Sequence, residues 1–332
     1  MKKIIVIALV CAMVAGAAFA AGGAQPGQAE DNFPSKPVTA MVAWAPGGGG
    51  DLVFRALAEA FPKYANGQPL LIVNKGEAAG VPGIMDFKQN AKPDGYDVMH
   101  WNPAHVIKTH MDPVPFTGTE FQAICQVVLS NNFLTVPADA KWQTLQDYIA
   151  DAKANPGQIS IGNAGAGGGN HFGALLFEKY AGIQLKHIPF AGGGPAITGL
   201  LTGDCQSTMA NPPEGAPNVL AGQLKVLALF GDVRNPIFPG PNVPTGKEAG
   251  VNFAISHWRG VVTPAGTPEA IVLKLQNIFK QIIEDPTFIQ RMETLGSTPA
   301  FTDAKTYAAQ IAADDKMYEG LVKENKLGNR YK

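Results

Sequence analysis

The chain has no surplus of basic residues. Lys and Arg together number 26 against 27 Asp and Glu, which gives a net charge of −1. It therefore lacks the charge pattern of a nucleic-acid-binding protein, and no basic amphipathic run suggests a membrane surface. If the chain binds an anion, local groups must hold it, because the overall charge does not attract it.

Cysteine is scarce, with three residues in the chain. Cys11 lies in the N-terminal segment, which leaves Cys125 and Cys205. Two thiols can pair only if their Cα atoms come within reach, which the sequence does not show. We favour two buried free thiols over a disulfide. A catalytic Cys–His pair needs a proximity in space that the sequence does not reveal either.

Two enzyme signatures are absent. There is no G-x-x-x-x-G-K-[ST] phosphate loop and no G-x-S-x-G nucleophile elbow. Gly165–Asn170 comes near a dinucleotide fingerprint but ends in Asn, and the next strand carries Lys186-His187 where an acidic residue is needed. A secreted or periplasmic α/β enzyme acting on a nucleotide or a carboxylate is therefore only the alternative interpretation.

The apolar run at the N-terminus, Ile4–Val14, is too short to span a bilayer, which needs roughly 20 residues. Lys2 and Lys3 precede it, and Ala18-Phe19-Ala20 follows as a small-residue cleavage signal. We expect residues 1–20 to be a signal peptide cleaved near Ala20, which directs the chain to the periplasm. A lipoprotein anchored through Cys11 is the alternative, although Leu9-Val10 lacks the small residue such a site needs. Residues 21–32 have the composition of a disordered lead-in.

Glycine is abundant, and its first cluster follows an apolar run. Val38–Trp44 reads as a strand, Ala45–Asp51 (APGGGGD) as a loop, and Leu52–Phe61 as a helix. Four consecutive glycines leave backbone amides unshielded, so a ligand can approach them closely. Asp51 is placed to be the N-cap of the helix. The remaining free amides and the helix dipole favour an anion.

A second cluster repeats this order. Gln158–Ile161 reads as a strand, Gly162–Asn170 as a loop, and His171–Tyr180 as a helix. Gly48–Asp51 can be laid over Gly167–Asn170. We interpret this as two similar α/β lobes, each offering a helix N-terminus to a shared cleft. The alternative, that such loops are ordinary α/β turns, remains open.

The rest of the chain alternates strands and helices. This pattern predicts mostly parallel sheets with ligands beyond the C-terminal strand ends, where Trp44, the first glycine loop and Trp101-Asn102 lie. The chain is expected to cross between lobes near Val136 and to return through Phe253–Arg259. Further helices are predicted at roughly 84–89, 145–154, 196–201, 264–285 and 304–324, with another opening at Pro286.

Five segments together resemble the extracytoplasmic receptors of tripartite tricarboxylate transporters, known as Bug receptors. They are Pro34–Pro37, Ala45–Gly49 with Asp51, Lys92–Tyr96, Gly192–Ala196 and Pro264–Pro268. The resemblance runs from about Phe33 to the C-terminus. It implies an α/β, two-lobed periplasmic-binding-protein fold of type II, in which each lobe is a mostly parallel sheet flanked by helices and two strands cross between the lobes. Lobe 1 would be residues 33–135 plus 255–332, and lobe 2 residues 136–254.

The resemblance also implies a function. Such a receptor is not an enzyme, carries no cofactor or metal, and is expected to be a monomer. It closes over a small organic acid (a mono-, di- or tricarboxylate, an aromatic acid or an acidic amino acid) and delivers it to membrane permease subunits. The loops matching Pro46–Asp51 and Gly162–His171 would grip the carboxylate through backbone amides and bridging waters.

This chain departs from the family in both loops. Asn163, Gly168, Gly169 and Asn170 stand where hydroxyl side chains are usual, and Gly50 stands where Thr is common. We therefore expect backbone amides and water molecules to make more of the hydrogen bonds to the ligand. We also expect room for a bulkier acid against Trp44 and Trp101. The predicted ligand-binding residues are Trp44, Pro46, Gly47, Gly48, Gly49, Gly50, Asp51, Trp101, Asn102, Asn163, Ala164, Gly165, Gly167, Gly168, Gly169, Asn170 and His171.

For several residues the sequence allows two possible roles. Asp51 is either a cap paired with Arg55 or a ligand contact. Asn170 is expected to be a cap, and His171 either bonds the ligand or packs in its loop. His100, His105 and His110 recur every five residues, which does not place them on one helix face, so a metal site is not expected. Trp258 and Arg259 either close the cleft or belong to a surface or hinge.

Overall fold

Two groups of parallel strands are joined by two long strands in the computed structural model of the chain. The structure describes residues 32–231, 234, 240 and 242–329. Residues 34–332 form one unit, described below, and residues 1–33 form another. The predicted signal peptide and almost all of the predicted lead-in lie outside the described residues.

The first half of the fold alternates strands and helices. Strand β1 (Val38–Val42) pairs in parallel with both β2 (Leu70–Asn74) and β3 (Asp97–Trp101). Four of the five β1 residues are buried, as expected for a strand covered on both faces. The connecting helices are α2 (Gly49–Tyr64), the 3-10 turn η1 (Glu77–Gly80) with α3 (Val81–Asn90), and α4 (Pro103–Met111).

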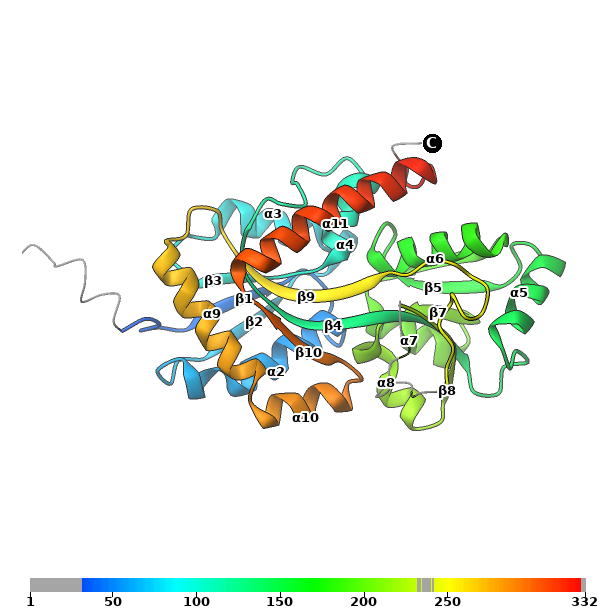
Figure 1. Cartoon of the computed structure of the whole chain (residues 1–332), viewed down its shortest axis with the longest axis horizontal. Helices are drawn as coiled ribbons and strands as arrows, with labels where there is room; N and C mark the ends of the chain where they lie inside the picture. The colour runs from blue at the N-terminus through cyan, green and yellow to red at the C-terminus, as the bar shows by residue number, and fades with distance from the viewer. Residues whose placement is uncertain (1–31, 232–233, 235–239, 241, 330–332) are drawn as a thin grey trace, which may run out of the picture. The chain divides into compact units, whose positions relative to one another are not determined.

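Strands β4 (Gln122–Pro137) and β9 (Ser256–Thr263) cross between the halves (Figure 1). They pair in antiparallel fashion from Gln122 opposite Thr263 to Asn131 opposite Ser256. Strand β9 also pairs with β3, while the far end of β4 pairs with strands of the second half. The two crossover strands expected of the fold are thus present, and the first is one continuous strand whose pairing changes between Asn131 and Asn132, before the predicted position near Val136.

The second half repeats the pattern of the first. Strand β5 (Ser160–Ala164) pairs in parallel with β6 (Lys186–Phe190) and with β7 (Ser207–Ala210). Strand β8 (Leu224–Phe230) lies antiparallel on β4. The helices of this half are α5 (Leu145–Ala154), α6 (Gly169–Ala181), α7 (Gly193–Thr202) and α8 (Pro212–Leu220).

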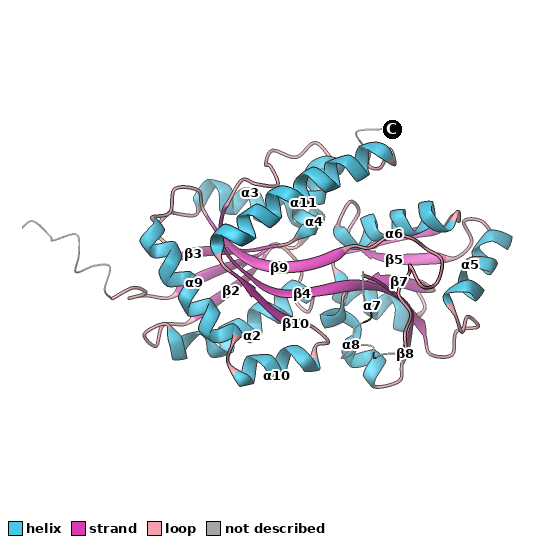
Figure 2. Ribbon diagram, in the orientation of Figure 1, coloured by secondary structure: helices cyan, strands magenta, loops and turns pink. Residues whose placement is uncertain are grey.

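The C-terminal part of the chain returns to the first half (Figure 2). It contains α9 (Glu269–Ile283), α10 (Pro286–Thr294), β10 (Thr298–Thr302) and α11 (Ala304–Glu324). The helix predicted at 264–285 is confirmed as α9, and Ile271, Leu275, Ile278 and Ile282, which recur at helical spacing, form its buried face. Helix α11 packs on α4 and on the crossing strand β4.

The predicted order of elements is confirmed, with differences at the ends of the elements. Helices α2 and α6 begin at Gly49 and Gly169, within the glycine clusters, because glycine here takes up helical conformation rather than remaining in the loop. Helix α4 and strand β10 were not predicted. The segment 235–250, in which proline and glycine are dense and predict a loop, lies partly outside the described residues. Cys125 and Cys205 are both buried and unpaired, as expected.

Candidate functional site

Five helix N-termini converge on one buried cavity between the two halves. They belong to α2, α4, α6, α7 and α8, and the enclosed volume is about 20 Å³. That space holds roughly one water molecule. The halves touch on both sides of it, α2 against α8 and α4 against α6. The lining residues are Trp44, Gly48, Gly49, Gly50, Asn102, Ala104, Ala164, Gly169, Asn170, Gly193, Asn211, Glu214, His257 and Arg259.

The first glycine loop is closed by Asp51, but not in the predicted way. Gly48, in an extended conformation, is the N-cap of α2 and has no side-chain cap, so the expectation that Asp51 caps the helix is wrong. Asp51 lies in the first turn, where its carboxylate accepts the N–H of Gly47 at 2.8 Å. It also accepts from Nε of Arg55 at 2.9 Å and Nδ2 of Asn74 at 2.9 Å. The predicted Asp51–Arg55 pair is thus confirmed.

The second glycine loop is built in the same way. Gly168 is the N-cap of α6, so the expectation that Asn170 caps this helix is wrong. The N–H of Gly167 donates to Nδ1 of His171 at 3.0 Å. Gly47 and Gly167 both adopt positive φ, 77° and 75°, which favours glycine. The two loops therefore correspond with Gly47 over Gly167, one residue away from the alignment made on sequence.

A carboxylate lies among these helix ends. Glu214, in the first turn of α8, accepts from the N–H of Asn211 at 3.1 Å, which completes a capping box. The amide Nδ2 of Asn170 donates to the same carboxylate at 3.3 Å, and so does the N–H of Gly49 at 3.4 Å. Asn211 also donates to Oδ1 of Asn170 at 2.9 Å. Asn170 thus links α6 to α8 instead of capping its own helix.

Arg259 supplies the cation of the cavity. It lies on the crossing strand β9 and is 1% exposed. Its Nη1 donates to Oγ of Ser130 at 3.3 Å, whereas its Nε has no hydrogen-bond partner among the described residues. Burial lowers the pKa of Arg259 to about 10, and the negative charge of Glu214 acts in the opposite direction. The guanidinium therefore remains charged at neutral pH.

Three buried histidines lie close to one another in the first half. His100 lies in β3, one residue before its end, His105 lies in α4 and His257 lies on β9. Burial lowers the pKa of His105 to about 3. Burial, aided by the neighbouring Arg259, holds the pKa values of His100 and His257 well below the usual range. All three rings are thus neutral at pH 7, and His257, which lines the cavity, can meet a ligand as a hydrogen-bonding group rather than as a charge.

Trp44 closes the cavity toward the outside. Its ring stacks on that of His105, with centroids 5.3 Å apart and planes 10° apart. Trp44 and Ala164 line both the cavity and an outer groove of about 530 Å³. The indole Nε1 and both ring nitrogens of His100 and His105 are buried without hydrogen-bond partners among the described residues. Of these three residues Trp44 lines the cavity, and its unpaired donor indicates a place where a polar ligand or water binds.

The predicted site residues fall into three groups. Trp44, Gly48, Gly49, Gly50, Asn102, Ala164, Gly169 and Asn170 line the cavity. Gly165 lines the outer groove, and Gly167 and His171 line a neighbouring groove of about 420 Å³. Pro46, Gly47, Asp51, Trp101, Asn163 and Gly168 lie on none of these surfaces.

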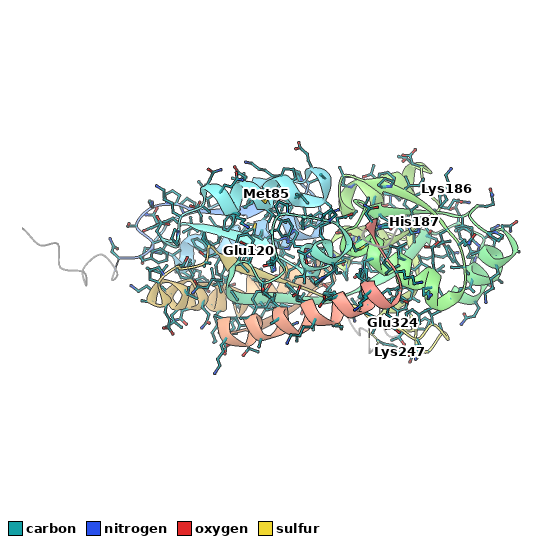
Figure 3. All side chains as sticks on the ribbon, turned by 90° about the horizontal axis from the view of Figure 1, so that it is seen from above. Met85, Glu120, Lys186, His187, Lys247 and Glu324 are labelled. Carbon is teal, nitrogen blue, oxygen red and sulfur yellow. The ribbon has the colours of Figure 1, made fainter. Side chains whose placement is uncertain are left out.

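Two members of the third group have other partners. Trp101 belongs to the core, where its Nε1 donates to the carbonyl oxygen of Gly118 at 3.2 Å, so it does not form a wall with Trp44. Nδ2 of Asn163 lies 3.0 Å from Nδ1 of His187. Like Lys186, His187 lies in the second half, whereas Met85 and Glu120 lie in the first (Figure 3). The Asn163 side chain therefore bonds within its own half.

The sequence did not indicate Glu214 or His257 as site residues and left the role of Arg259 undecided. One signal was available for Arg259, because it lies on the segment predicted to return between the lobes. No local pattern marks the others. In the described part of the chain, no cluster of His, Cys, Asp or Glu is arranged to hold a metal ion. None of the helices in that part is long and apolar enough to cross a membrane.

Known structures share this fold. The periplasmic binding protein BugD superposes with a TM-score of 0.83 at 26% identity, over 89% of this chain and 99% of BugD. MatC from Rhodopseudomonas palustris, solved with malate, superposes with a TM-score of 0.80 at 23% identity, over 87% and 100% of the two chains. A second protein of that organism, solved with adipate, gives 0.81 at 23% identity, over 89% and 99%.

The sequence itself matches the same group. It is 34% identical over 323 residues to the UPF0065 protein in the gbd 5′ region of Cupriavidus necator, covering 95% of both chains. Residues 53–327 match the family of tripartite tricarboxylate transporter receptors. The resemblance stated from the glycine loops and turn motifs is thus confirmed. The chain belongs to the tripartite tricarboxylate transporter family of substrate-binding receptors.

Proposed function

We propose that this receptor binds a small organic acid at the cavity and hands it to the permease of a tripartite transporter. The observation that carries the proposal is the convergence of five helix N-termini on the cavity that is also lined by the buried Arg259. Helix N-termini and a buried cation both stabilise a carboxylate. Malate and adipate, bound by two proteins of the same fold, are acids of this class.

The closed cavity is too small for such an acid, so binding requires the halves to separate. We propose residues 33–135 with 255–332 as lobe 1 and 136–254 as lobe 2, moving about the crossing strands. The ligand would enter past Trp44 and then be enclosed. A ligand that binds one closed form stabilises it, by about 2.7 kcal/mol at 100 times the dissociation constant.

Several features support a receptor rather than an enzyme. The residues lining the cavity include no Ser, Thr or Cys that could act as a nucleophile. The buried side chains of His100, His105 and His257 are held neutral, with pKa values far below those useful for proton transfer at pH 7. The N-terminal pattern supports export to the periplasm by a cleaved signal peptide. We propose that the receptor acts there as a monomer.

The test is native mass spectrometry of the purified mature protein, followed by thermal-shift measurements with malate, adipate, aromatic acids and amino acids. Arg259→Gln should abolish the shift, whereas Arg291→Gln, on the exposed face of α10, should retain it. Absence of a shift with every acid would refute the proposal. So would an acid response that Arg259→Gln leaves intact.

A further inference from the structure

Glu214 lies where several helix ends meet. Its carboxylate accepts from Gly49 at the start of α2, from Asn170 at the start of α6 and from Asn211 at the cap of α8. A Cβ built on Gly193, the first residue of α7, would lie 2.0 Å from its carboxyl carbon. The Gly49 contact joins α8 to the other half of the fold. One internal carboxylate thus occupies the kind of environment that a bound acid requires.

Glu214 and the guanidinium of Arg259 meet over the same backbone position. A Cβ built on Gly49 would lie 2.4 Å from Nη2 of Arg259 and 3.3 Å from Oε1 of Glu214. These two described side chains do not form an ion pair, but the charge of Glu214 raises the pKa of Arg259 against the effect of burial. The positive charge of Arg259 is therefore partly neutralised by the negative charge of Glu214.

We propose that, in the protein without ligand, the Glu214 carboxylate binds the donors that a ligand carboxylate would use. We further propose that its negative charge determines which acids the site accepts. The inference rests on the proposed function. An incoming acid competes with Glu214 for the Gly49 N–H, for the Asn170 amide and for the field of Arg259. Until it does so, the Gly49–Glu214 contact holds the two halves together.

Glu214 does not leave the site when the ligand enters. Its bonds to the N–H and Nδ2 of Asn211 lie within α8 and survive the loss of the Gly49 contact. One negative charge therefore stays beside Arg259, and a second ligand carboxylate placed in the same cavity would be repelled by it. The site selects acids that insert a single carboxylate. A second carboxylate is tolerated only when it is distant enough to reach past Trp44 into the outer groove.

Glu214 could instead serve only as the capping-box residue of α8. Gln also completes a capping box, so Glu214→Gln retains this role and removes the charge. Glu319→Gln makes the same change at an exposed position on α11 and is the matched control. A melting temperature of Glu214→Gln close to that of the wild type verifies that α8 remains capped.

Two measurements decide the inference. In the protein without ligand, hydrogen exchange of the peptide containing Gly49 should be faster in Glu214→Gln than in the wild type and unchanged in Glu319→Gln. In titration calorimetry, Glu214→Gln should bind malate, whose two carboxylates are close together, at least about tenfold more tightly, since removing a like charge from a buried site is worth more than 1.4 kcal/mol. Its affinity for adipate should rise less.

Equal exchange at Gly49 in the variant and the wild type would overturn the inference. So would weaker binding of both acids by Glu214→Gln, or an unchanged ratio of malate to adipate affinity. If the wild type binds no acid at all, the proposed function fails, and with it the claim about ligand selectivity. The exchange measurement on the protein without ligand still decides whether Glu214 holds the halves together.

Discussion

Asp51 and His171 have the same structural role in the two halves of the protein. Each lies in the first turn of its helix, and each accepts the N–H of the glycine four residues before it, at 2.8 Å from Gly47 and 3.0 Å from Gly167. A carboxylate and an imidazole thus close two equivalent loops. Both loops present their following helix N-terminus to the cavity, so these side chains position the site without lining it.

The first prediction concerns these two residues. Asp51→Ala should reduce the free energy of unfolding by about 2–3 kcal/mol, because Gly47, Arg55 and Asn74 all lose a buried, charged acceptor. His171→Ala should cost less, about 1 kcal/mol, because it removes a neutral hydrogen bond. Urea denaturation checks both. An Asp51→Ala loss no larger than that of His171→Ala would contradict this account.

The second prediction compares two glycines in helices. A Cβ on Gly49 would lie 2.4 Å from Nη2 of the fully buried Arg259, so Gly49→Ala should destabilise the fold by about 1–3 kcal/mol. Nothing lies within 4 Å of a Cβ on Gly320 in α11, so Gly320→Ala should stabilise it by about 0.5–1 kcal/mol. Thermal unfolding in the absence of ligand measures both changes. Effects of the same sign would show that Gly49 is not confined by Arg259.

The third prediction concerns Trp44. Because it lines the cavity and the outer groove, ligand binding should change its fluorescence. The other tryptophans are buried away from the cavity, with their Nε1 groups bonded to Gly118, Asp151 and Asp314. The fluorescence change on adding adipate should therefore be lost in Trp44→Phe and kept in Trp142→Phe. A change that persists in Trp44→Phe would exclude a ligand beside this ring.

The fourth prediction concerns pH. Burial lowers the pKa values of His100, His105 and His257 in the folded state, so below about pH 6.5 the unfolded chain binds more protons than the folded one. Their contribution to stability is complete above that pH and is lost as the pH falls toward the folded pKa values. The slope should reach about 1.4 kcal/mol per pH unit for each histidine.

Unfolding free energies between pH 7 and 5 measure this slope. Carboxylates with lowered pKa values, such as Asp285 and Asp147, titrate below this window and contribute little to it. His105→Gln should reduce the slope by about one third, because one of three equivalent groups is removed. A slope that the variant leaves unchanged would show that the buried histidines do not cause the pH dependence.

Local patterns in the sequence determined much of the fold. The alternation of apolar strands with helices, and the turn chemistry of glycine and proline, depend on neighbouring residues, so they predicted the parallel sheets, both crossings and most helices. Elements without a strong local signal, such as α4 and β10, were missed. The register of the two glycine loops was also misjudged by one residue. Gly48 and Gly168 are the N-caps because Asp51 and His171 each bond to the glycine four residues earlier in their own loop.

The composition of the cavity was decided by the tertiary structure. The sequence alone determined that glycine-rich helix starts would face a common cleft, because that follows from the order of strand, loop and helix. Arg259 and His257 come from a crossing strand and Glu214 from a helix of the other half, so only the tertiary structure brings them to one cavity. A buried arginine has no periodicity or motif of its own. Burial lowers its pKa and the nearby Glu214, which comes from a separate part of the chain, opposes this effect.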